Sequence, residues 1–129
     1  MNGKINGVTV RFRIFSGRRD PEWELDEEAV RKLKSLLEKT VKGERIDEAP
    51  TGGLGYRGFL VRCGPEVRDL PTDFIVFRGV LTENPGPKAV HRRDTGGVEE
   101  FLLAEARRQG YGGVIDRESI KIDPVGKPE

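Results

Sequence analysis

The alternation of apolar and polar side chains over residues 8–15 is the pattern that most constrains the fold of this chain. Its apolar members are Val8, Val10, Phe12 and Ile14. Successive side chains of a β-strand point to opposite faces, so a period of two places these residues on one face and the residues between them on the other. We therefore expect a half-buried strand whose apolar face packs against the rest of the protein.

A segment with helical periodicity follows at residues 26–42. Its apolar residues include Val30, Leu33, Leu37 and Val41. This spacing forms a stripe along one side of a helix. Asp26 is suited to cap the N-terminus, because its carboxylate can accept a hydrogen bond from a free backbone N–H group, and Gly43 is suited to end the helix. The sequence predicts an amphipathic helix that packs against the sheet.

The rest of the chain is expected to contribute further strands and a second helix. The expected strands cover residues 56–63, 73–81 and about 119–122, and the second helix covers about 98–109. Residues 43–55 and 82–97 are expected to be loops, because they contain clustered glycine and proline. Residues 123–129, which contain two prolines, are expected to form a frayed tail.

This order of elements predicts a single α+β domain over residues 1–129. We expect a two-layer sandwich in which an antiparallel sheet carries two helices on one face. With the last strand included, the order matches the ferredoxin-like βαββαβ pattern. Without that strand, another two-layer α+β sandwich fits the pattern equally well.

Charge and composition argue against nucleic-acid and membrane partners. The formal net charge is only +1, which gives no basic footprint for a nucleic acid. Arg57-Gly58-Phe59 is similar to the start of an RNA-recognition signature, but Leu60 and Val61 follow where further aromatic residues should alternate. No apolar run is long enough to span a membrane.

The chain contains a single cysteine, Cys63, and a single histidine, His91. One cysteine cannot form an internal disulfide, and these two residues are too few for a zinc site of the usual Cys and His type. We therefore expect a reducing, cytoplasmic setting, no metal site and no cofactor.

Residues 16–23 have an unusual composition for a connector, with two arginines, two acids and a serine but little apolar filler. Arginine can hold a carboxylate or phosphate through paired hydrogen bonds, so we expect this loop to converge on an anionic group. We expect the tryptophan to wall one side of the site. The predicted ligand-binding residues are Ser16, Arg18, Arg19, Trp23, Arg57 and Arg78.

A purely structural interpretation of the same loop is the alternative. Its arginines would pair with Asp20 or Glu22, and Trp23 would fill the core at the edge of the sheet. The arginine content has a general explanation as well. Fifteen arginines together with one glutamine and three asparagines are typical of heat-adapted proteins.

Two functions from different classes fit these observations. The leading hypothesis is a small binding or interaction module that recognises an acidic small molecule or an acidic protein segment through the arginine-rich loop. The alternative is a small enzyme with its site between loops 16–24 and 82–97. Its candidate residues are His91 or Asp94 as the base and Arg18 or Arg19 as the charge stabiliser. Self-assembly through an exposed strand edge, giving a homo-oligomer, is a third possibility.

Overall fold

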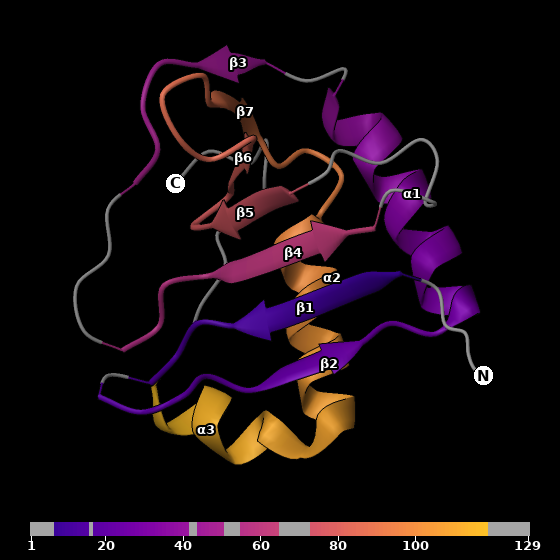
Figure 1. Cartoon of the computed structure of the whole chain (residues 1–129), viewed down its shortest axis with the longest axis vertical. Coiled ribbons are helices and arrows are strands. Elements are labelled where there is room, and N and C mark those ends of the chain that lie inside the picture. The colour runs from indigo at the N-terminus through magenta and orange to yellow at the C-terminus, as the bar shows by residue number, and fades with distance from the viewer. Residues whose placement is uncertain (1–6, 16, 42–43, 51–54, 65–72, 119–129) are drawn as a thin grey trace.

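The computed structural model describes residues 7–15, 17–41, 44–50, 55–64 and 73–118 of the chain. Ser16, the strand expected near 119–122 and the tail 123–129 lie outside these residues. The described part is a mixed α+β structure built on a seven-stranded sheet in which every neighbouring pair is antiparallel (Figure 1). The prediction of an α+β protein with an antiparallel sheet is therefore confirmed.

The strands lie in the order β2-β1-β4-β5-β6-β7-β3 across the sheet. Their bounds are β1 Val8–Phe12, β2 Glu22–Glu24, β3 Arg45–Ile46, β4 Phe59–Cys63, β5 Asp73–Phe77, β6 Val80–Glu83 and β7 Val90–Arg93. The helices are α1 Glu27–Val41, α2 Val98–Ala106 and the short α3 Gly112–Arg117. The turn Arg107–Tyr111 joins α2 to α3, and Gly110 kinks the chain there with a φ of 101°.

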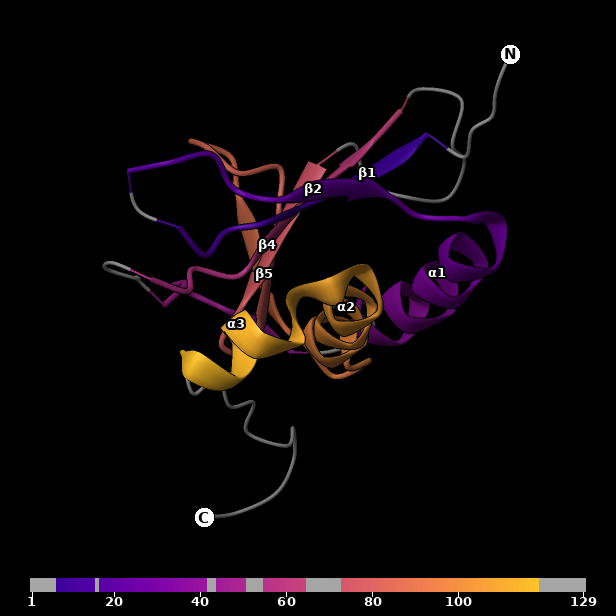
Figure 2. The same cartoon turned by 90° about the horizontal axis from the view of Figure 1, so that it is seen from below.

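Helices α1 and α2 lie against the same face of the sheet (Figure 2). The alternation predicted for β1 explains why, since Val8, Val10 and Phe12 are completely buried on that face. Thr9 and Arg11 lie on the other face, which the two helices leave uncovered. Within the described ranges, no helix has the length and apolar character needed to cross a membrane.

The expected single strand at 73–81 is wrong, because the chain reverses at Arg78 and Gly79. Their φ values of 50° and 80° are both positive. Such a two-residue turn matches the twist of a hairpin and joins β5 to β6. Apolar residues on both sides of the turn produced a continuous apolar pattern, and that pattern concealed the reversal.

The expected βαββαβ order is not found in the described residues. Strands β2, β3 and β7 arise in segments that were predicted to be loops, and they are two to four residues long. Strand β2 reverses the chain before α1, so that β1 and β4 are antiparallel neighbours. Short strands carry little periodic pattern of their own, and pairing with a longer neighbour defines them.

A buried carboxylate ties α2 to the β5–β6 turn. Glu99 is 1% exposed, and it accepts hydrogen bonds from the backbone N–H groups of Arg78 (3.0 Å) and Gly79 (2.8 Å). The hydroxyl of Tyr56 donates a further hydrogen bond to it. Burial, followed by the Glu99 charge, raises the pKa of the Tyr56 hydroxyl, so it stays a donor at ordinary pH. Asp94 is 2% exposed and caps α2 by accepting hydrogen bonds from the N–H groups of Val98 and Glu99.

Replacing Glu99 with alanine is expected to lower the free energy of unfolding by about 3 kcal/mol, because buried donors lose their acceptor. Urea unfolding measures the change. Glu100→Ala is the matched control, since Glu100 lies in the same first turn of α2 but is exposed. That variant should change the stability by less than about 0.5 kcal/mol. Equal losses in the two variants would show that Glu99 acts only through the helix dipole.

Candidate functional site

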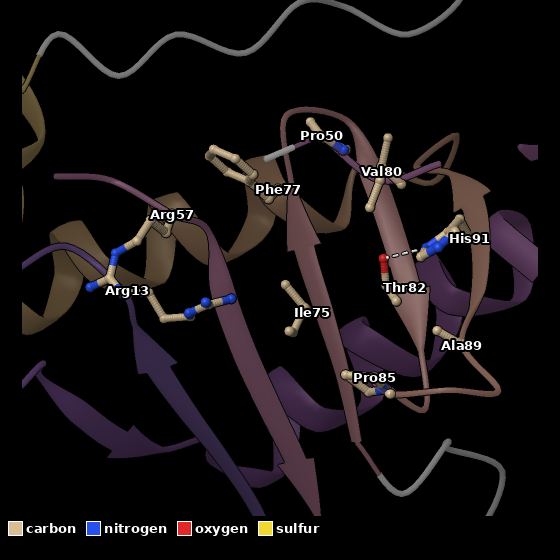
Figure 3. A pocket seen from close by; sticks show the side chains of 12 residues that line it. Arg13, Pro50, Arg57, Ile75, Phe77, Val80, Thr82, Pro85, Ala89 and His91 are labelled. Carbon is tan, nitrogen blue, oxygen red and sulfur yellow. Dashed lines mark hydrogen bonds between the residues drawn. The ribbon is translucent and has the colours of Figure 1, made fainter. Parts of the chain in front are cut away.

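A cavity of about 310 Å³ lies on the sheet face that α1 and α2 leave uncovered (Figure 3). Strands β5, β6 and β7 supply its floor, and residues 49–50 and 85–89 supply its walls. Its lining residues are Arg13, Ala49, Pro50, Arg57, Ile75, Phe77, Val80, Thr82, Pro85, Gly86, Ala89 and His91.

Strand register explains how these distant residues meet. Leu60 pairs with Ile75, Ile75 with Thr82, and Thr82 with His91. Directly paired residues on neighbouring strands point to the same face of a sheet, so these side chains form one row across β4, β5, β6 and β7. The opposite face of β5 and β6 carries Phe74, Val76 and Leu81, which are fully buried in the core. The row therefore belongs to the uncovered face.

One end of the cavity is cationic. Arg13 and Arg57 both line it there (Figure 3). The Arg57 side chain is held in place, because it donates to the carbonyl oxygens of Phe15 (2.8 Å) and Gly55 (3.2 Å). It also lies 3.5 Å from a carboxylate oxygen of Asp20.

The Arg13 guanidinium differs from that of Arg57, since it makes no hydrogen bond or ion pair with any described residue. Its side chain is partly buried. Burial lowers the pKa of Arg13, and the nearby Arg57 charge lowers it further. The Asp20 carboxylate partly opposes this lowering, although it forms no hydrogen bond or ion pair with the Arg13 guanidinium. Arg13 thus places a partly desolvated positive charge at the cavity.

The other end of the cavity is polar and contains no arginine, lysine or carboxylate among its lining residues. The Thr82 hydroxyl lies 2.9 Å from Nδ1 of His91, within hydrogen-bonding distance (Figure 3). Thr82 is 7% exposed, and His91 is partly buried. Between the two ends the floor is apolar, formed by Ile75, Phe77 and Val80.

The structure brings only one predicted ligand-binding residue, Arg57, into this cavity. Arg18 and Arg19 are exposed and do not line it, and the Arg18 guanidinium lies 3.8 Å from the ring centre of Phe15. Arg78 lies exposed in the β5–β6 turn, over the Phe77 ring. Ser16 lies outside the described residues.

Trp23 lies in the hydrophobic core. It pairs with Val10 and stacks on Tyr111 with ring centres 5.9 Å apart, on the face that the helices cover. The acids of the loop do pair with arginines, but not with the loop arginines that the structural interpretation expected. Asp20 accepts hydrogen bonds from the backbone N–H groups of Ile14 and Phe15 and contacts Arg57, and Glu22 pairs with Arg11.

Of the alternative catalytic residues, His91 lies in the cavity and Asp94 does not. Both carboxylate oxygens of Asp94 accept hydrogen bonds at the start of α2. Sequence reasoning missed Arg13 and Thr82. Arg13 belongs to the polar face of the first predicted strand, and that alternation is a signal that could have identified it. Thr82 becomes a candidate only through its pairing with His91.

Comparison of this chain with protein-family models, with curated proteins and with solved structures finds no significant match. Among the residues that the structure describes, no group of three or more His, Cys, Asp and Glu side chains could hold a metal ion. The chemistry of the cavity therefore has to be inferred from its own side chains.

Cys63 is expected to react slowly with thiol reagents. It is 6% exposed, and burial raises the pKa of its thiol by about two units, to about 11. A raised pKa leaves less thiolate, so at pH 8 the folded protein should contain about a hundredfold less of the reactive form than the unfolded chain. Ellman's reagent measures both rates, with the protein in guanidinium chloride as the control. Similar rates would contradict the buried position of this thiol.

Proposed function

We propose that this protein is a binding module that holds a small carboxylate-bearing ligand in the uncovered-face cavity. The observation that carries the proposal is the Arg13 guanidinium, which lines the cavity and has no hydrogen bond or ion pair to any described residue. An acidic ligand bound by arginine agrees with the hypothesis from the sequence. The proposed site, however, lies at the end of β1 and not in the loop at 16–23.

Electrostatics support an anionic ligand. Partial burial of a guanidinium is unfavourable unless an opposite charge compensates it, and a second guanidinium nearby adds repulsion. The Asp20 carboxylate already offsets part of this cost, and a ligand carboxylate between Arg13 and Arg57 would offset more of it. It could also accept two parallel hydrogen bonds from one arginine, which is the strong and directional form of this contact.

The remaining surface of the cavity favours a small ligand with an apolar body. Ile75, Phe77 and Val80 form an apolar floor, and Pro50 and Pro85 contribute to the walls. The volume of about 310 Å³ is at the lower end of the range for ligand pockets, roughly 300–1,000 Å³. An aromatic or short aliphatic acid suits this volume better than a folded protein segment does.

Benzoate is the simplest probe of this proposal. We expect it to shift the amide signals of β5, β6 and β7 in a ¹⁵N-correlated NMR titration, because those strands form the floor of the cavity. Arg13→Gln should weaken the binding about tenfold or more, since a charge-assisted contact is lost.

The matched control for this experiment is Arg18→Gln, which removes the same charge from an exposed arginine outside the cavity. Its dissociation constant should remain close to that of the wild type. If Arg18→Gln weakens benzoate binding and Arg13→Gln does not, the loop at 16–23 is the site and the cavity is not.

One observation favours a catalytic alternative, namely the distance of 2.9 Å between the Thr82 hydroxyl and Nδ1 of His91. This is the spacing of a hydroxyl nucleophile and its base. In known examples a third group orients the base, and no described carboxylate forms a hydrogen bond or ion pair with His91. Binding without catalysis therefore agrees better with the geometry.

An activated ester, p-nitrophenyl acetate, tests this alternative. If Thr82 were a nucleophile, its oxygen would attack the acetyl carbon, His91 would take the hydroxyl proton, and p-nitrophenolate would leave. We expect intact-mass and peptide-mapping mass spectrometry to find no acetyl group on Thr82. An acetyl-Thr82 adduct that His91→Ala abolishes would instead show that the protein is an enzyme.

A further inference from the structure

We propose that the ligand of the cavity is a hydroxylated aromatic carboxylate, bound with its carboxylate at Arg13 and Arg57 and its hydroxyl at Thr82, whose own hydroxyl is paired with His91. This inference rests on the function proposed above and adds the identity of the ligand class. It uses the fact that the two ends of the cavity differ in chemistry and are separated by an apolar floor.

The span between the two ends suits a single ring. Arg13 directly follows β1, and Thr82 lies on β6, which is three strands away in the order β1-β4-β5-β6. Neighbouring strands lie about 4.8 Å apart, and Thr82 is in register with Arg11, two residues before Arg13, so the two backbones are separated by roughly 16 Å. The long Arg13 side chain covers part of that distance. The space that remains corresponds to one aromatic ring with substituents at opposite positions.

The middle of the cavity supports a flat apolar body. Figure 3 shows Ile75 between the arginine end and the Thr82–His91 end, with Phe77 and Pro85 to either side of it. Ile75 is the partly exposed member of this floor, whereas Phe77 and Val80 are only 6% and 9% exposed and are largely packed into the protein. A planar ring placed on Ile75 would bury apolar surface.

The Thr82–His91 pair can recognise a phenolic hydroxyl in either tautomer of the histidine. If Thr82 donates to Nδ1 of His91, the threonine oxygen can still accept a hydrogen bond from the phenol. If instead Nδ1–H donates to Thr82, the threonine hydroxyl is free to donate to the phenol oxygen. A phenol both donates and accepts, so it can bond Thr82 in either arrangement. A purely apolar acid would displace water from these groups without offering them hydrogen bonds in return.

The test compares 4-hydroxybenzoate with benzoate in the same NMR titration. We expect the hydroxylated acid to bind about tenfold more tightly, which is the typical worth of one additional hydrogen bond. Thr82→Val should remove this difference, because valine keeps the shape of threonine without the hydroxyl and is well tolerated in strands. Thr9→Val is the matched control, since Thr9 lies on the same sheet face but outside the cavity lining. It should preserve the tenfold difference.

The outcomes separate this inference from the function on which it rests. Equal affinities of the wild-type protein for the two acids would overturn the inference and leave the carboxylate-binding function standing. A tenfold preference that persists in Thr82→Val would also overturn it, because the hydroxyl would then lie elsewhere. Failure of both acids to bind would overturn the inference and the proposed function together.

Discussion

The buried carboxylate of Glu99 is the interaction on which much of this structure depends. It lies at the start of α2 and accepts hydrogen bonds from two backbone N–H groups of the β5–β6 turn and from the hydroxyl of Tyr56. A turn whose two central residues have positive φ leaves these N–H groups pointing in one direction, and without water they require an acceptor. One side chain therefore fixes the position of α2, the reversal of the chain and the segment before β4.

These contacts of Glu99 reach the cavity through neighbouring residues. Tyr56 packs edge-on against Phe77, with ring centres 5.5 Å apart, and Phe77 lines the cavity. Arg57 directly follows Tyr56 and forms part of the cationic end. The core thus positions one floor residue and one charged residue of the candidate site. A rigid scaffold behind polar groups reduces the ordering that a ligand would have to impose on binding.

The two faces of the sheet differ in burial and in polarity. The face covered by α1 and α2 carries completely buried residues such as Val10, Phe59 and Val76. The other face combines an apolar floor with Arg13 at one end and the Thr82–His91 pair at the other. A charged side chain on that face keeps some access to solvent or to a ligand, so its desolvation costs less than it would in the core.

Local patterns in the sequence determined β1, α1 and α2, because periodicity and capping act within a few residues. The reversal at Arg78-Gly79, the short strands β2, β3 and β7, and the meeting of Arg13, Arg57 and His91 were decided only by the tertiary structure. Those features depend on which strands pair and in which register. Pairing energies arise between residues far apart in the chain, and no local pattern records them.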